Sequence, residues 1–379
     1  MDAIAEHSVS LSVKLPPGPV HRGMETFYNP LMISNRNIAV LLLNSISLKS
    51  MNMADPLAGS GIRSLRFLRE LNQGKINHLF INDMKENFEA VFHQSLKLNG
   101  LKPKNVSIFQ QDASSFLMNR VDDAAKPSGF CGYFDYIDLD PFGSPNPFLS
   151  AAIAKIARHG IIAVTATDTA ALTGTYPLVT QRKYWATPLK NYLMHEIGLR
   201  ILIRKVQLLG MQFDKALTPL LSYHKEHYLR IYFQSEKGKE QCDTLVNEHQ
   251  YFWFCQKCFN FKTSTFNNGQ CSCGAAFLFA GPLWVGPLQD KKLILTMAKK
   301  NPFPEEQKFL DLLREESKLK VVGFYDSHEM AHRCRKEPLP METVLRAWKG
   351  VRTHFSPTGV KTKRTHKEVA GLYAKSAPK

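Results

Sequence analysis

The sequence has no apolar run long enough to cross a bilayer, and its first residues lack the basic and then apolar pattern of a secretory signal. Acidic residues are also few, because 33 Asp and Glu stand against 49 Lys and Arg, which gives a formal net charge of +16. A membrane protein and a protein acting on a neutral metabolite are therefore disfavoured. We expect a cytoplasmic monomer, or a nuclear one if the source has a nucleus, that acts on a polyanion.

The positive charge is concentrated at the end of the chain. Residues 331–379 contain twelve Lys or Arg and three acidic residues, so +9 of the excess lies there. A basic end can be merely a solvated one, but here aromatic and turn residues stand between the cations. This pattern favours a surface that binds nucleic acid.

Cysteine is scarce as well, with seven residues in 379, which argues against a disulfide framework. Four of the seven lie close together, and their spacing is typical of a structural zinc site in a reducing compartment: Cys255, Cys258, Cys271 and Cys273. The second pair is Cys-x-Cys and therefore tighter than the usual Cys-x-x-Cys. Four thiolates leave no open coordination position, so a catalytic zinc is disfavoured; free buried thiols are the alternative.

Strand and helix patterns alternate through the first two thirds of the chain, which predicts an α/β fold with a doubly wound, mostly parallel sheet. The expected strands are residues 51–55, 78–81, 106–109, 133–140 and 160–165. We expect one domain over residues 1–235, a linker over residues 235–239, and a smaller α+β domain over residues 240–379. The second domain should contain the cysteines, the basic end and short helices at residues 304–313 and 340–348.

Acidic residues follow several of these strands, at the edge where ligands bind in open α/β sheets. Gly59 and Gly61 open a turn, but Ser64 occupies the third glycine position of the dinucleotide fingerprint, which disfavours a nicotinamide cofactor. Asp83 follows Gly61 by 22 positions, close to the roughly 20 expected for an acid that binds ribose hydroxyls. Asp112 either lies near an adenine or caps the next helix.

The fourth strand ends in the turn Asp140-Pro141-Phe142-Gly143. Asp140 and the main-chain carbonyl beside Pro141 are acceptors, and Phe142 places an aromatic face next to them. The amino edge of a nucleobase would satisfy both features. An ordinary strand-ending turn is the alternative.

An aromatic, proline-containing stretch precedes the first predicted helix. Asn35 can cap that helix, and Arg36 in its first turn needs an anionic partner or solvent. Phe27 either fills the core or stacks on a base.

Several longer motifs together resemble the tRNA (guanine-26-N2)-dimethyltransferases, from about residue 21 to residue 362. They are Phe27-Tyr-Asn-Pro30, Asn35-Arg36, Gly61-Ile-Arg-x-x-Arg66, Asp138-x-Asp140-Pro-Phe-Gly-Ser-Pro145, Thr165-Ala-Thr-Asp-Thr169, His195-Glu-x-Gly-Leu-Arg200 and Arg352-Thr-His-Phe-Ser-Pro-Thr-Gly-Val-Lys-Thr362.

The resemblance implies a Rossmann-like class I methyltransferase domain, S-adenosyl-L-methionine as the cofactor, and as the substrate the tRNA guanine at the junction of two arms. It also implies a set of cofactor contacts and the four cysteines as zinc ligands. The implied cofactor contacts are Arg36, Arg66, Asp83, Asp112 and Ala113.

Guanine's exocyclic amine is a poor nucleophile because its lone pair is conjugated into the ring. We expect Asp140 and the neighbouring carbonyl to stabilise the charge that develops on this nitrogen, and Asp140 to accept its proton. Phe142 and Phe27 would hold the flipped base between them. A DNA amino-methyltransferase and a non-catalytic RNA-binding protein with a vestigial cofactor fold are the alternatives, against which the C-terminal motif and the intact Asp83 and Asp140 argue.

Overall fold

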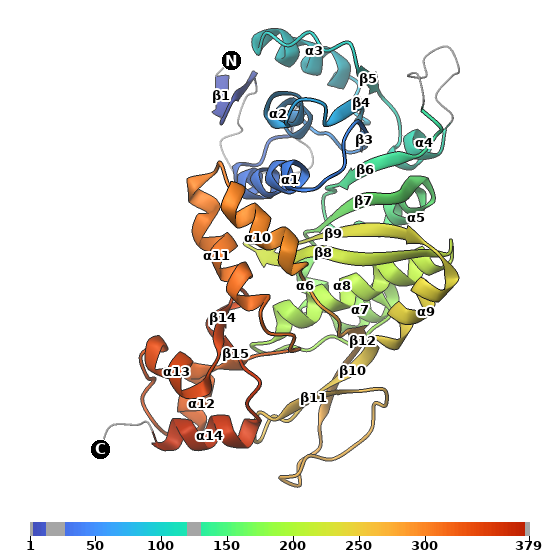
Figure 1. The fold of residues 1–379 in the computed structure, drawn as a ribbon. Coiled ribbons are helices and arrows are strands. Elements are labelled where there is room, and N and C mark those ends of the chain that lie inside the picture. Colours follow the sequence, from blue (N-terminus) through green and yellow to red (C-terminus); the bar gives the residue numbers. More distant parts are fainter. Residues whose placement is uncertain (1–2, 13–26, 120–129, 376–379) are drawn as a thin grey trace.

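The computed structural model describes residues 3–12, 27–119 and 130–375, and at its centre lies a seven-stranded sheet in the order β5-β4-β3-β6-β7-β9-β8 (Figure 1). The strands β3 to β7 run parallel, whereas β9 is antiparallel to both β7 and β8. The predicted α/β class with a mostly parallel sheet is confirmed. The strands are β3 (Met51–Asp55), β4 (Ile76–Asn82), β5 (Val106–Phe109), β6 (Phe134–Leu139), β7 (Ile156–Ala166), β8 (Lys215–Lys225) and β9 (Tyr228–Lys237).

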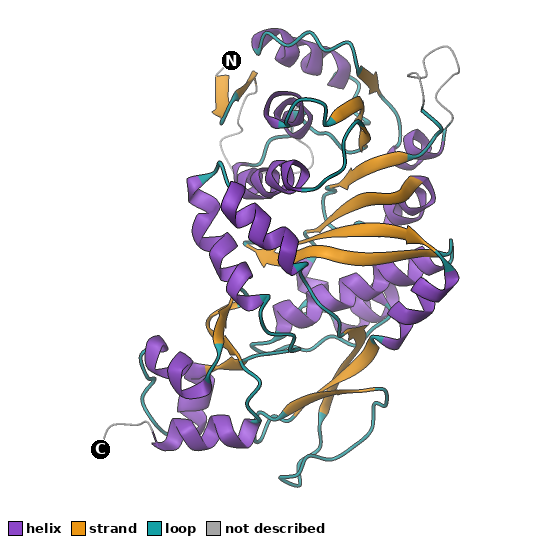
Figure 2. Cartoon of the chain, in the orientation of Figure 1, coloured by secondary structure: helices purple, strands orange, loops and turns teal. Residues whose placement is uncertain are grey.

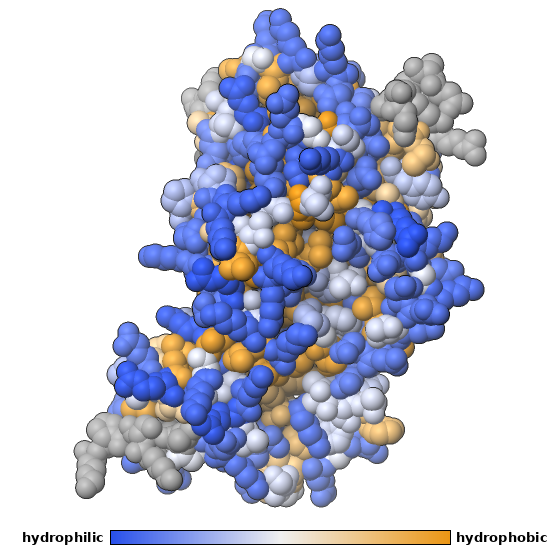
Figure 3. All heavy atoms as spheres, viewed as in Figure 1, coloured by the Kyte–Doolittle hydropathy of each residue, from blue (hydrophilic) through white to orange (hydrophobic). Residues whose placement is uncertain are grey.

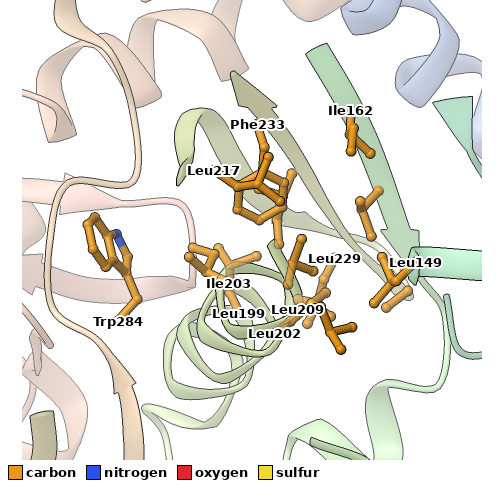
Figure 4. Packing of buried hydrophobic residues seen from close by; sticks show 14 of the residues in the cluster. Leu149, Ile162, Leu199, Leu202, Ile203, Leu209, Leu217, Leu229, Phe233 and Trp284 are labelled. Atoms are coloured by element: carbon orange, nitrogen blue, oxygen red, sulfur yellow. The ribbon is translucent and has the colours of Figure 1, made fainter. Parts of the chain in front are cut away.

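Helices cover both faces of the sheet (Figure 2). Because side chains alternate along a strand, Met53 and Tyr136 pack with one layer of helices, and Ala54 and Ile137 pack with the other. The first layer contains α1 (Ile33–Ser45), α2 (Ile62–Glu70) and α3 (Phe88–Leu98). The second contains α4 (Ala113–Met118), α5 (Asn146–Lys155) and α8 (Met194–Met211), whose packing against β8 and β9 is shown in Figure 4.

The start of α1 differs from the sequence prediction. Asn35 lies inside the helix and is fully buried, so it is not the cap. The reason is that a short 3-10 turn, η1 (Pro30–Met32), begins the helical path earlier, and the side chain of Asn29 accepts a hydrogen bond from Leu31 N at 3.0 Å. The first element of the chain, the hairpin of β1 (Ala3–Glu6) and β2 (Val9–Ser12), joins the same apolar cluster as α2 and α3.

The C-terminal third contains two small antiparallel sheets and short helices. The expected linker is wrong, since Ser235 lies within β9 and α9 begins at Lys239. The elements that follow β9 are α9 (Lys239–Asn247), β10 (His249–Phe254), β11 (Phe261–Ser264), β12 (Leu278–Trp284), α10 (Lys291–Lys300), η3 (Pro304–Glu306), α11 (Gln307–Glu316), β13 (Tyr325–Asp326), α12 (Ser327–Arg333), α13 (Met341–Trp348), β14 (Val351–Thr353), β15 (Ser356–Lys361) and α14 (His366–Lys375). Two further short helices, α6 (Thr169–Leu172) and α7 (Pro177–Tyr184), lie between β7 and α8.

The apolar core continues from the sheet into this C-terminal part. Phe252 and Trp284 belong to the cluster that contains α8, and Ile294 and Leu310 belong to the cluster that contains α1. This packing crosses the predicted boundary on both faces of the sheet. The division into domains over residues 1–235 and 240–379 stays a prediction.

A buried group of ions also joins the two parts. Lys361 Nζ at the end of β15 lies 3.0 Å from Glu196 Oε1 on α8 and 3.3 Å from Glu316 Oε1 on α11. Burial raises the pKa of Glu316, but His354 and Lys361 outweigh it and lower that pKa to about 2. Removing one member of such a group would leave a buried charge without its partner, so the joint resists opening.

The surface shown in Figure 3 is largely hydrophilic. Among the described residues, no helix combines the length and the apolar content that a membrane crossing requires.

Candidate active site

The parallel strands bring the predicted acidic residues to one edge of the sheet. Asp55 ends β3, Asp83 follows β4, and Asp140 follows β6, while β3 pairs with both β4 and β6. Asp112 follows β5, which pairs with β4. The sequence therefore predicted correctly that Asp83, Asp112 and Asp140 follow neighbouring strands at this edge of the sheet.

The turn after β3 needs its glycines. Gly59 and Gly61 have φ of +62° and +75°, and a Cβ at residue 61 would lie 2.3 Å from the ring of Phe92. Asp83 Oδ2 accepts a hydrogen bond from Gly59 N at 2.7 Å, so this carboxylate ties the ends of β3 and β4 together. The two glycines therefore let the rings of Phe27 and Phe92 pack directly against the backbone of this turn.

Asp112 caps α4, because its Oδ1 accepts a hydrogen bond from Ser115 N at 2.9 Å. This is one of the two roles that the sequence left open for it. Ala113 is the first residue of the helix and is buried. Contacts of Asp112 and Ala113 with an adenine stay predictions.

Arg36 and Arg66 meet at a carboxylate of the N-terminal hairpin. Arg36 Nη2 lies 2.6 Å from Glu6 Oε2, and Arg66 Nη1 lies 3.0 Å from Glu6 Oε1. Arg66 also pairs with Glu70 at 2.7 Å. Of the two possibilities for Arg36, an anionic partner or solvent, the structure shows the anionic partner, Glu6. A contact of either arginine with the cofactor stays a prediction.

Asp140 is part of a group of ion-paired side chains that we call the charge network: Arg63, Asp138, Asp140 and Arg230. Arg63 Nη2 donates to Asp140 Oδ2, and Arg63 Nη1 lies 3.3 Å from Asp138 Oδ2. Arg230 Nη2 donates to the same Asp138 oxygen at 2.7 Å. The side chains of Asp138 and Arg230 are 0% exposed, whereas that of Asp140 is 19% exposed. The network therefore ends in one carboxylate that reaches the surface.

Two other buried acids at this edge differ in protonation. Burial raises the pKa of Asp138, but Arg230 and Arg63 outweigh it, and the pKa is lowered overall. Burial raises the pKa of Asp55 to about 7. It outweighs the next largest influence, the charge of Arg63, which lowers the pKa, and the charges of Asp138 and Asp140 raise the pKa further. Its Oδ2 accepts a hydrogen bond from Ser64 Oγ at 2.7 Å.

The two predicted base-stacking rings touch one another. The ring centroids of Phe27 and Phe142 are 4.1 Å apart and the rings meet edge to face at 68°. Phe142 is 46% exposed, whereas Phe27 also packs over the turn at Gly59. A base can lie between these rings only after they move apart, so the sandwich stays a prediction.

The turn that carries Asp140 is held by the segment that follows β7. Gly143 N donates to Thr167 Oγ1 at 2.7 Å, and Thr167 N donates to Gly143 O at 2.9 Å. Tyr184 Oη donates to Asp168 Oδ2 at 2.6 Å and lies 2.9 Å from Ser144 Oγ. These bonds fix the position of Asp140 and Phe142 relative to the sheet.

The family model described as N2,N2-dimethylguanosine tRNA methyltransferase matches residues 5–374. The chain belongs to this family. The motifs that resemble it therefore identified it correctly from the sequence.

Relatives in the family match nearly the whole chain. A tRNA (guanine(26)-N(2)/guanine(27)-N(2))-dimethyltransferase of Aquifex aeolicus is 37% identical and is aligned over 97% of this chain and 95% of its own. A tRNA (guanine(26)-N(2))-dimethyltransferase of Methanobrevibacter smithii is 35% identical over 90% and 89%. The structure of Trm1 from Pyrococcus horikoshii in complex with S-adenosyl-L-methionine has a TM-score of 0.83 at 29% identity and covers 98% of this chain and 99% of its own.

In this family member the four predicted zinc ligands form one cluster. The Sγ atoms of Cys255, Cys258, Cys271 and Cys273 all lie within 4.8 Å of one another. Cys255 and Cys273 are 3.5 Å apart and Cys258 and Cys271 are 3.3 Å apart, close to the roughly 3.8 Å edge of a tetrahedron with Zn–S bonds of about 2.3 Å. The short Cys271-x-Cys273 spacing does not prevent this geometry, and the donor set fits a structural zinc.

The sequence reasoning assigned no role to Arg63 or Arg230. Arg63 lies inside the motif that the family shares, three positions before the Arg66 that was chosen. Arg230 lies on β9, 92 positions from the Asp138 that it pairs with, and only the placement of β9 beside β7 brings the two together. The pattern of apolar residues within one helix or strand cannot indicate an ion pair between two separate strands.

Proposed function

We propose that this protein transfers one or two methyl groups from S-adenosyl-L-methionine to the exocyclic N2 amine of the guanine at position 26 of tRNA. The observation that carries the proposal is the place of Asp140: it is the one member of the charge network that reaches the surface, at the carboxyl end of β6 and beside the exposed ring of Phe142. Membership of the methyltransferase family supports the same reaction.

The edge of the sheet fits the cofactor. The tight positive-φ turn at Gly59 and Gly61 and the carboxylate of Asp83 after the next strand suit a nucleoside without a pyrophosphate. Asp112 and Ala113 stand after the next strand, where an adenine would lie. When bound, S-adenosyl-L-methionine supplies an electrophilic methyl group on a sulfonium.

Asp140 acts on the amine of the guanine. Arg63 holds Oδ2, which fixes the carboxylate in one orientation and leaves Oδ1 to accept an N–H of the base. As the nitrogen loses its conjugation with the ring, its hydrogens become more acidic and the carboxylate binds them more strongly. Because Asp140 is already ion-paired, its first role is as a fixed acceptor, and it takes the proton as the N–C bond forms rather than beforehand.

Phe142 offers the exposed face on which the base stacks. Phe27 closes the other side once the two rings separate, and the main-chain carbonyl beside Pro141 is the second acceptor for the amine. Both rings stand on segments that the sheet holds, since residue 142 follows β6 and Phe27 rests over the turn at Gly59. Stacking positions the amine and recognises only the shape of the base.

The four cysteines hold a structural zinc in this proposal. The site lies where β10 ends and the chain turns back into β11, away from the carboxyl end of β6, so the metal stabilises the C-terminal part and takes no part in methyl transfer. Metal analysis of the purified protein should find about one zinc per chain, and a Cys258→Ser variant should lose it. The enzyme is proposed to act as a cytoplasmic monomer.

The test is nucleoside analysis of tRNA treated with the enzyme and labelled S-adenosyl-L-methionine. Unmodified tRNA should gain N2-methylguanosine and N2,N2-dimethylguanosine, and a transcript with adenine at position 26 should gain none. Label at position 27 would resemble the activity in the name of the Aquifex aeolicus relative. Label in duplex DNA and not in tRNA, or no binding of the cofactor, would overturn the proposal in favour of one of the two alternatives.

A further inference from the structure

A cavity of about 680 Å³ lies in the C-terminal part of the molecule, away from Asp140. Its walls come from β10 and β11, from Val285 after β12, from the chain between α11 and β13, and from the residues that lead from β15 into α14. In Figure 1, β11 and α14 lie at the lower end of the molecule and β3 and β4 in its upper half. We call this cavity the basic groove.

Among the described residues that line the groove, several are cations and none is acidic. Five Lys or Arg side chains contribute to its walls: Lys262, Lys320, Lys363, Arg364 and Lys367. Arg364 is paired with Glu368 at 2.7 Å, but no carboxylate among the described residues lies within ion-pair distance of the four lysines. All four lysines are exposed. Lys262 Nζ also lies 4.3 Å from the ring centroid of Trp253, a cation–π contact that does not neutralise its charge.

The amino end of α14 does not add a second anion site. Thr365 N donates to Glu368 Oε2 at 2.8 Å, and this capping carboxylate occupies the end of the helix. An anion in the groove would therefore be held by the lysine side chains. Exposed ammonium groups of this kind bind phosphates as mobile point charges rather than through one fixed geometry.

We infer that the basic groove binds a stretch of the tRNA sugar-phosphate backbone remote from the guanine that is methylated. The inference rests on the proposed function, which supplies the polyanion. Its own support is the convergence of uncompensated cations from three segments on one concave surface. Charge complementarity with phosphates accounts for an arrangement that would otherwise destabilise the fold through repulsion between like charges.

The inference predicts a change in the salt dependence of tRNA binding. Each lysine that contacts a phosphate contributes about 0.7 to 0.9 to the slope of log K against log salt. The double variant Lys320→Ala/Lys363→Ala should therefore lower that slope by about 1.4 to 1.8, because both side chains lie in the groove. Binding of S-adenosyl-L-methionine, and transfer to a short RNA that contains only the target guanine and its neighbours, should not change.

The matched control removes two exposed lysines elsewhere. Lys102 and Lys104 lie between α3 and β5, and the Lys102→Ala/Lys104→Ala variant changes the net charge equally. An unchanged slope in the groove variant, or an equal loss in the control, would overturn the inference and leave the groove to another acidic partner. Failure of the wild-type enzyme to methylate tRNA would instead contradict the proposed function, and nucleoside analysis records that outcome separately.

Discussion

The charge network and the basic groove are both groups of ionised side chains, but they differ in burial and in ion pairing. In the charge network, Asp138 and Arg230 are 0% exposed and each charge has a partner at hydrogen-bond distance. In the basic groove the lysines are exposed and the described residues give them no carboxylate. A buried side chain with ion-pair partners is held in one position. An exposed cation without a carboxylate partner instead attracts an anion over a Debye length of about 8 Å at physiological salt.

The difference assigns separate tasks to the two regions. The charge network positions one carboxylate for chemistry and so should control the rate of methyl transfer. The basic groove should control how tightly and with what salt dependence the RNA binds. Substitutions in one region should therefore leave the other property unchanged.

The largest effect is expected from Asp140→Ala, which removes the surface member of the network. Loss of the acceptor for the amine should lower kcat by about 10² to 10⁴, while the Kd for S-adenosyl-L-methionine stays the same. Asp140→Asn keeps an acceptor oxygen without the charge, so its kcat should fall between that of the wild type and that of Asp140→Ala. Rapid-quench assays at saturating tRNA measure this, and normal turnover of the alanine variant would refute the role of Asp140.

The second effect concerns stability. Arg230→Met leaves Asp138 buried with Arg63 as its remaining cation, and should lower the free energy of unfolding by about 3 to 5 kcal/mol. The matched control is Arg364→Met, which breaks an exposed pair in the groove and should cost less than about 1 kcal/mol. Urea unfolding of both variants measures the contrast, and equal losses would show that burial does not distinguish the two regions.

A third prediction uses the pH dependence of Asp55. Its pKa is raised from 3.8 to about 7, so between these values the folded state keeps a proton that the unfolded chain has released, and stability falls as the pH rises through this window. Asparagine at residue 55 does not titrate, so Asp55→Asn should not lose stability in this window. Between pH 4 and pH 8 its free energy of unfolding should rise relative to that of the wild type by on the order of 3 kcal/mol. Unfolding curves at both pH values test it; a constant difference between variant and wild type would contradict the shift.

The smallest effect is expected at the stacking ring. Phe142→Ala should lower kcat/KM for tRNA by about 5- to 150-fold, since stacking of a base on an aromatic ring contributes roughly 1 to 3 kcal/mol. Cofactor affinity should be unchanged. Tyr133→Ala, at the other end of the same strand segment and 48% exposed, is the control and should have little effect. An unchanged Michaelis constant and rate for Phe142→Ala would count against stacking.

Much of the sheet could be predicted from the sequence because its signals are local. The run at residues 106–109 matches β5 at both ends, and the acids that follow the strands depend only on where each strand stops. The prediction that Asn35 caps α1 was wrong, because the helical path begins earlier, at the 3-10 turn that Asn29 and Pro30 start. A turn of three residues is too short to show a periodic pattern of apolar residues.

The site was predictable only in part. Asp140 and Phe142 follow from the turn that ends the fourth strand, but the partners that orient Asp140 depend on tertiary placement. Arg63 reaches it from α2, and Thr167 reaches Gly143 from the segment after β7. The edge-to-face contact of Phe27 with Phe142 was also invisible, because the sequence places two rings near one ligand without fixing the distance between them.

Lys361, enclosed between Glu196 and Glu316, has a consequence for the choice of RNA. Since these ion pairs fasten β15 and α11 to α8, the span from the basic groove to Asp140 cannot stretch or shorten freely. The enzyme would then select its target by distance. With phosphates bound in the basic groove, only a guanine at a fixed distance from them in the folded RNA would reach Asp140. Selection of a single nucleotide would come from length rather than from reading the bases around it.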